Sequence, residues 1–136
     1  MELATARDFL RDHHRAVLLT TRADGGPQMS PVLVGLDAEG YAVISTRETA
    51  AKCRNVLRTP EVALCVLSDG FFGTWAQIEG TAEVIRLPEA MEHLENYYRG
   101  ISGEHEDWDD YRAAMERERR VVIRVKLTKA GPDRHG

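Results

Sequence analysis

The sequence predicts a mainly β protein of the α+β class, with about six strands in a small, mostly antiparallel barrel and helices packed outside. Short apolar runs recur along the 136 residues and are often separated only by turn residues. The clearest turn is Asp24-Gly25-Gly26, which joins two strand-like runs as a hairpin. The strand–helix alternation of a doubly wound sheet is missing, as is a GxGxxG motif after a strand.

The first part of the chain is expected to form one helix and three strands. Apolar side chains recur on one face of residues 2–13, which favours an amphipathic helix. Residues 15–21 form an apolar run too continuous for a half-exposed surface, so a buried strand is expected there. The hairpin then leads into a return strand over residues 27–36. A second turn over 37–40 precedes a third strand over 41–44.

The return strand has two distinct faces. Because side chains alternate along a strand, Gln28, Ser30 and Val32 are expected to point to one side. Pro31 lies on the other side and has no backbone N–H, so it cannot complete a ladder of hydrogen bonds. This strand is therefore expected at a sheet edge or with a bulge at Pro31.

A short helix is expected directly after the third strand. Ser45 is followed three residues later by Glu48, which fits a capping box. Pro60 disfavours a helical residue before it, so the helix should stop near Thr59. One side of this helix is apolar and is expected to face the core: Ala50, Cys53, Val56 and Leu57.

Cations surround the start of this expected helix. Lys52 and Arg54 flank its apolar stripe, and Arg47 lies further back. Helix starts bear unpaired N–H groups and partial positive charge, so this arrangement suits an anion such as a phosphate. An ordinary solvated amphipathic helix would show the same spacing, and the spacing alone favours that interpretation.

The second half of the chain is expected to contribute further strands and two more helices. Expected are strands over 62–67 and 74–87, a helix beginning at Pro88, a helix over 107–118 and a final strand over 121–127. Gly80 within the long strand predicts a bulge or sharp bend. Residues 129–136 are polar and expected to fray. Residues 1–136 read as one domain.

Composition limits the function classes. The net charge is −4 without a polybasic block, which disfavours nucleic acid as a partner. No apolar run approaches the ~20 residues of a membrane helix, and residues 1–15 lack the apolar centre of a secretory signal. We therefore expect a cytoplasmic protein. Cys53 and Cys65 are interpreted as small buried hydrophobes, and no cysteine–histidine pattern predicts a metal.

Five stretches together resemble one protein group. The chain is similar to the flavin/deazaflavin oxidoreductase superfamily, the pyridoxamine 5′-phosphate oxidase-like split β-barrels, and more narrowly to its branch that binds coenzyme F420. The resemblance spans roughly residues 5–128. It depends on Gln28-Met29-Ser30-Pro31-Val32, residues 45–55, Arg58-Thr59-Pro60, Glu79-Gly80-Thr81-Ala82 and residues 98–111. The last stretch, with Gly103-Glu104-His105 and Trp108-Asp109-Asp110-Tyr111, is the most specific for the deazaflavin branch.

The resemblance implies a six-stranded split barrel that forms a homodimer, with cofactor sites between the subunits. The strand from Gln28 to Val32 would lie along the cofactor ring, while Ser45, Thr46 and the nearby basic residues hold its phosphate. Relatives often have a further basic residue where Ala50 stands, and Arg47 would have to compensate. The expected cofactor-binding residues are Gln28, Ser30, Pro31, Val32, Ser45, Thr46, Arg47, Lys52, Arg54, Asn55 and Trp75.

Other polar and aromatic residues give weaker signals. Two interpretations of Trp75 are equally supported: it stacks on a cofactor ring, or it is buried in a dimer interface. Trp108 and Tyr111 have helical spacing and are expected in the core. His105 lies among carboxylates that favour its protonated form, but a capped, solvated loop explains it better than a proton donor. No catalytic residue is identified.

Three functions remain open. The first is an F420-dependent oxidoreductase that transfers hydride between reduced F420 and an unsaturated small molecule. The second is an FMN-binding oxidase or reductase of the same fold, because an anion site accepts either phosphate. The third is a non-catalytic F420 carrier, because the sequence shows no obvious acid–base residue.

Overall fold

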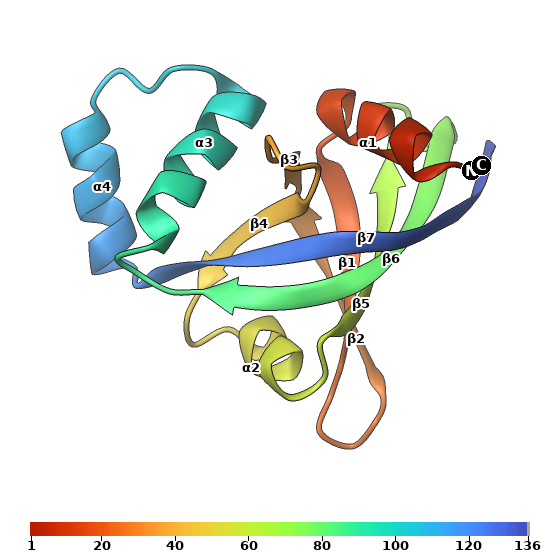
Figure 1. The fold of residues 1–136 in the computed structure, drawn as a ribbon, viewed down its shortest axis with the longest axis horizontal. Helices are drawn as coiled ribbons and strands as arrows, with labels where there is room; N and C mark the ends of the chain where they lie inside the picture. The colour runs from red at the N-terminus through yellow and green to blue at the C-terminus, as the bar shows by residue number, and fades with distance from the viewer. Residues whose placement is uncertain (136) are drawn as a thin grey trace.

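A single antiparallel sheet organises the chain, which the computed structural model describes over residues 1–135 (Figure 1). Its seven strands lie in the order β2-β1-β5-β6-β7-β4-β3. They are β1 (Arg15–Thr21), β2 (Pro27–Leu33), β3 (Gly35–Leu36), β4 (Ala42–Arg47), β5 (Glu61–Leu67), β6 (Thr74–Ile85) and β7 (Arg120–His135).

The sheet has one strand more than the six expected, because the return strand divides at Val34. The N–H of Val34 donates to the carbonyl of His14 at 2.7 Å, on the β1 side. The next two residues, Gly35 and Leu36, pair with β4 instead. The chain thus passes at Val34 from one edge of the sheet to the other.

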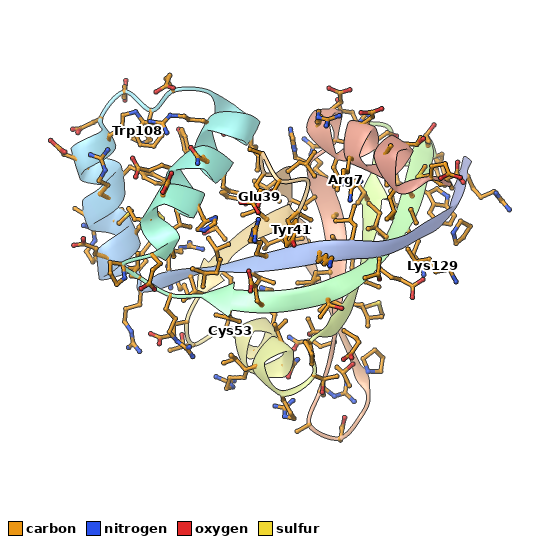
Figure 2. The ribbon with its side chains drawn as sticks, in the orientation of Figure 1. Arg7, Glu39, Tyr41, Cys53, Trp108 and Lys129 are labelled. Carbon is orange, nitrogen blue, oxygen red and sulfur yellow. The ribbon has the colours of Figure 1, made fainter. Side chains whose placement is uncertain are left out.

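Four helices surround the curled sheet: α1 (Leu3–Asp12), α2 (Ala51–Arg58), α3 (Ala90–Ser102) and α4 (Trp108–Arg117). In Figure 1, α3 and α4 stand together at one end, whereas α2 lies below the sheet and α1 above it. Cys53 is fully buried between α2 and the sheet (Figure 2). None of the helices in the described residues is long and apolar enough to cross a membrane.

The curled sheet is a split barrel, as expected. At one edge, β2 pairs only with β1, which is the edge position that Pro31 predicts. At the other edge, β3 pairs with β4 only at Ala42 and Val43, so the rest of that edge of β4 has no partner strand in the part of the chain that the structure describes. Within the described residues, β2 and β4 form no ladder with each other, so the barrel stays open between them.

The core lies inside the barrel, and a smaller cluster lies outside it. Leu18, Ile44, Leu64 and Ile123 are almost fully buried inside. The second cluster fills the space between the helix pair α3–α4 and the outer side of β4 and β7: Val43, Ala90, Leu94, Tyr111 and Val122. The helix pair is therefore fixed to the sheet beside the open edge of β4.

The expected capping box at Ser45 and Glu48 is wrong. Ser45 belongs to β4, which continues to Arg47 because it pairs with β7 up to Arg120. The N–H of Glu48 donates to the carbonyl of Arg119 at 2.9 Å, so it is not free for capping. Helix α2 begins only at Ala51, and its N-cap Ala50 provides no side-chain cap.

Two further expectations differ from the structure. Leu57 does not face the core, since 53% of it is exposed, and Asn55 takes a buried position on α2 instead. Residues 129–135 are not frayed, because β7 continues beside β6 up to the pair Thr74–His135. Gly136 lies outside the described residues. Both chain ends lie close together in Figure 1.

We expect Gly80→Ala to destabilise the barrel. A register shift follows Glu79, as the glycine predicts, and an added Cβ at Gly80 would meet the carbonyl oxygen of Lys126 and lie 2.6 Å from Val125 Cγ1. Such overpacking costs about 1–3 kcal/mol, measurable by urea unfolding. Gly100→Ala is the control, because the space around Gly100 in α3 is open and alanine should add about 0.5–1 kcal/mol. Equal effects would contradict the bulge argument.

Candidate functional site

An open groove of about 480 Å³ follows the split in the barrel. Its volume falls within the usual range of small-molecule sites, about 300–1,000 Å³. The lining comes from the free edges of β2 and β4, from α2, from the helix pair and from the first residue of β7: Pro31, Val32, Leu33, Ser45, Thr46, Lys52, Tyr97, Tyr98, Tyr111, Met115 and Arg120.

The two unpaired strand edges give the groove polar atoms. Ser45 and Thr46 lie on β4 beyond its short pairing with β3, so their backbone groups on that side have no ladder partner. On the facing wall, Val32 and the last residues of β2 provide an apolar surface and further free edge groups. A flat molecule inserted here would contact apolar side chains and backbone donors together.

Three tyrosines of the helix pair, which we call the tyrosine wall, line the groove beside the strand edges: Tyr97, Tyr98 and Tyr111. Tyr97 Oη donates to the carbonyl of Leu33 at 2.9 Å, and Tyr111 Oη donates to the carbonyl of Leu94 at 2.8 Å. Burial raises the pKa of Tyr97, and burial raises the pKa of Tyr111 to about 12. Both phenols therefore stay neutral near pH 7 and act as fixed dipoles and aromatic surface.

Lys52 and Arg120 are the cations that line the groove. Lys52 lies at the start of α2, where backbone N–H groups have no intrahelical partner. Among the described residues, the Lys52 ammonium has no ion pair or hydrogen bond. Arg120 is paired with Glu118, its Nε donating to Glu118 Oε1 at 3.0 Å. An anion in the groove would therefore meet an uncompensated positive charge at Lys52.

Arg54 and Gln28 do not line the groove. Arg54 lies on another side of α2, where its Nη1 donates to the carbonyl of Thr49 at 2.8 Å. It borders a separate depression of about 350 Å³, together with Gln28, Asn55 and the guanidinium groups of Arg22 and Arg58. The structure thus separates Lys52 and Arg54, which the sequence groups together.

Asn55 is a structural residue in this geometry. It is only 5% exposed, and its Nδ2 lies 3.1 Å from Thr20 Oγ1 and 2.7 Å from Gln28 Oε1. These contacts join α2 to β1 and β2. Asn55 therefore fixes the distance between the helix that bears Lys52 and the strand that forms the opposite wall.

Three other expected site residues lie outside the groove lining. Arg47 is exposed at the end of β4, with its Nη2 3.7 Å from Glu118 Oε1. Ser30 shares a face of β2 with Val32 but lies two residues earlier in the strand and does not line the groove. Trp75 lies on β6, where it pairs with Leu67, three strands away from β2. Within one chain, Trp75 is remote from the groove.

The α3–α4 connection is an ordered aromatic cluster. His105 Nδ1 accepts a hydrogen bond from the N–H of Asp107 at 2.9 Å, and Asp107 caps α4. The His105 ring lies 4.9 Å from the ring of Tyr98. Tyr111 is buried as expected, whereas Trp108 at the start of α4 is only partly covered (Figure 2). A capped loop, as favoured from the sequence, describes His105 well.

Sequence reasoning missed the tyrosine wall and Arg120. Tyr97 and Tyr98 are both half-buried and both pack against the outer cluster, and their adjacency on a helix gave no clear signal that they would also line a groove. Arg120 gave no such signal, because a charged residue before an apolar strand is common.

A flat outer face adjoins the groove. The outward side chains of β2, β1, β5 and β6 are mostly apolar, and the residues at the end of β2 border both the groove and a shallow hollow of about 370 Å³ on this face. Met29 is 65% exposed and Leu33 50%. We call this surface the outer face: Val17, Leu19, Met29, Pro31, Leu33, Ala63, Cys65, Leu67 and Trp75.

The chain resembles known proteins in sequence and in fold. A family model described as Pyridoxamine 5'-phosphate oxidase matches residues 3–131. The chain is 29% identical over 119 residues to an F420H(2)-dependent biliverdin reductase of Mycobacterium tuberculosis (strain CDC 1551 / Oshkosh). The aligned residues cover 88% of this chain and 79% of the relative.

Two solved structures show the same fold. A conserved hypothetical protein from Mycobacterium tuberculosis superposes with a TM-score of 0.77 and 22% identity, covering 96% of this chain and 82% of that one. A protein named F420 Reductase superposes with a TM-score of 0.71 and 21% identity, covering 92% and 94%. At these identities the similarity concerns the fold alone.

We expect Asn55→Ala to lower the free energy of unfolding by about 1–3 kcal/mol, because Thr20 and Gln28 lose their buried amide partner. Thermal or urea unfolding measures the loss. Asn96→Ala is the control, since Asn96 is exposed on α3 and its removal should change stability by less than about 0.5 kcal/mol. An equal effect at both positions would contradict the structural role of Asn55.

Proposed function

Since the chain belongs to the pyridoxamine 5'-phosphate oxidase family, we propose that it is an F420-dependent oxidoreductase acting on an unsaturated small molecule. The observation that supports this best is the groove itself. It combines a flat apolar wall, neutral phenols and an unpaired Lys52 beside Ser45 and Thr46. A planar ring with an anionic side chain is the chemistry that such a groove accommodates.

Each element of the groove has a defined role in this proposal. Pro31 and Val32 give the ring an apolar surface, and the free edge of β4 offers backbone donors to its polar atoms. Ser45, Thr46 and Lys52 bind the phosphate. When bound, reduced F420 supplies a hydride from C5 of its ring to the substrate.

The protein contributes position and electrostatics to the reaction. Tyr97 and Tyr111 are held by hydrogen bonds to backbone carbonyls, so the tyrosine wall keeps its shape when a ligand enters. Their raised pKa values make them poor proton donors near pH 7. The groove is open, and solvent is therefore the proposed source of the proton that completes the reduction.

Two alternatives follow from the same groove. FMN has a planar ring and a phosphate, and the family's name refers to an oxidase, so an FMN-dependent oxidase or reductase is the second candidate. A non-catalytic F420 carrier is the third, because a groove that binds without a dedicated acid would serve storage equally well. The three differ in cofactor preference and in turnover.

We further propose that the protein is a homodimer that pairs through the outer face. That face presents apolar side chains side by side on β2, β1 and β5, with Trp75 on β6, while Arg15, Gln77 and Glu79 are its polar members. The residues at the end of β2 border both this face and the groove, so a second copy would reach the groove rim. Trp75, remote from the groove of its own chain, would then be available to the neighbouring site.

Met29→Asp is expected to convert the dimer into a monomer, because it places a charge among the apolar side chains of the outer face, where Met29 is 65% exposed. Sedimentation velocity at micromolar concentrations measures the change. Leu57→Asp is the matched control, since Leu57 on α2 is 53% exposed but lies outside the outer face. A monomeric parent, or a monomer in both variants, would rule out pairing through the outer face.

The function is tested by titrating the purified protein with F420 and with FMN, using F420 fluorescence and flavin absorbance. We expect preferential F420 binding that weakens on Lys52→Ala by about 1–3 kcal/mol, the range of a lost charge-assisted contact. Lys129→Ala removes an exposed charge from β7, far from the groove, and should leave binding unchanged (Figure 2). Unchanged affinity in Lys52→Ala would remove Lys52 from the site.

The same preparation separates the three functions. A yellow protein with bound flavin would favour the FMN alternative. Oxidation of reduced F420 with biliverdin, quinones or enones would support the oxidoreductase. Tight F420 binding without turnover of any of these substrates would favour the carrier.

A further inference from the structure

We propose that Arg120, held by Glu118, is the second cation of the cofactor's phosphate site, in the place that the sequence assigns to Arg54. This inference rests on the proposed function and identifies a binding residue within that groove. Arg120 lines the groove together with Lys52, Ser45 and Thr46, whereas Arg54 borders the other depression.

The register of the sheet places Arg120 beside Ser45. Ser45 pairs with Val122 and Arg47 with Arg120, in an antiparallel ladder. Residues opposite each other share a face, and so do residues two apart along a strand. Arg120 and Ser45 are therefore diagonal neighbours on the face of the sheet that the helix pair covers.

A tight turn fixes Arg120 in this position. Arg119 has a φ of 55°, the left-handed region, and it reverses the chain between α4 and β7. Its carbonyl accepts the N–H of Glu48 at 2.9 Å, and its Nη2 lies 3.3 Å from Glu48 Oε2. The turn is thus tied to the segment after β4, which leaves Arg120 little freedom to move away.

Glu118 orients the guanidinium without fully occupying it. Arg120 Nε donates to Glu118 Oε1 at 3.0 Å, and Nη2 lies 2.9 Å from the same oxygen. The contacts with Glu118 involve Nε and Nη2 of Arg120 and not Nη1. The Arg120 side chain is only 27% exposed, so it is partly desolvated, which strengthens its interaction with an incoming anion.

The local charge also favours an anion. Arg47 and Arg120 are directly opposite in the ladder, and like charges in such pairs repel. Glu118 approaches both arginines but balances only one of the two positive charges. Lys52 adds another charge without a described partner. A phosphate between Arg120 and Lys52 would complete the balance.

The test compares each cofactor with its phosphate-free counterpart; FMN and riboflavin differ in the phosphate alone, whereas F420 also carries a lactyl-glutamate tail that its chromophore lacks. The parent, Arg120→Gln and Arg120→Lys are titrated with F420 and with its phosphate-free deazaflavin chromophore, and in parallel with FMN and riboflavin. Loss of a charge-assisted hydrogen bond should weaken F420 binding about ten- to a hundredfold in Arg120→Gln. The phosphate-free chromophore should bind within about twofold of the parent, and Arg120→Lys should recover part of the loss.

Two comparator variants isolate the effect. Arg117→Gln removes an equal charge from an exposed position on α4 and should leave F420 binding within about twofold of the parent. Arg54→Gln should weaken F420 binding less than Arg120→Gln does. An equal loss for F420 and its phosphate-free chromophore, or unchanged F420 binding in Arg120→Gln, overturns the proposal.

The proposed function and this inference can fail separately. A parent that binds FMN but not F420, with Arg120→Gln weakening FMN and not riboflavin, would refute the F420 assignment and support Arg120 as a phosphate ligand. A parent that binds F420 tightly, with Arg120→Gln indistinguishable from it, would refute only the role of Arg120. A parent that binds none of these ligands overturns both.

Discussion

The missing hydrogen bonds between β2 and β4 are the constraint on which the rest of this structure depends. A closed barrel would pair every strand edge, whereas this sheet ends at β2 on one side and at the short strand β3 on the other. Unpaired edges normally invite uncontrolled association, so they must be covered or used. Here the helix pair covers part of the opening, and the remainder forms the groove.

Rigid neighbours hold the two sides of the opening apart. On one side, Asn55 joins α2 to β1 and β2 through buried amide hydrogen bonds. On the other side, Tyr97 joins α3 to the end of β2, and Tyr111 joins α4 to α3. The groove is therefore preformed, because each wall is fixed by contacts that do not involve a ligand. Preorganisation of this kind lowers the entropic cost of binding a flat cofactor.

Much of the fold follows from local patterns. The hairpin at Gly25, where φ is 86°, the edge position of Pro31 and the register shift at Gly80 all match what these residue types require. The start of α2 did not follow from its local pattern. Ser45 and Glu48 fit a capping box, but pairing of β4 with β7 satisfies the same backbone groups and is extended to Arg47. A distant strand thus overrode a local signal.

The sequence alone determined the antiparallel strands and the position of Lys52 on a short helix after a strand. It also determined that side chains along β2 alternate between a more exposed and a less exposed face. These features depend on neighbours within a few positions, where periodicity and turn chemistry act. Only the tertiary structure decided which cation joins Lys52 at the groove. Lys52 and Arg54 were expected in one anion site although they flank the apolar stripe of the helix, and in the structure they border separate hollows. Arg120 reaches the groove because ladder register joins segments far apart in the chain, and no local pattern encodes that register.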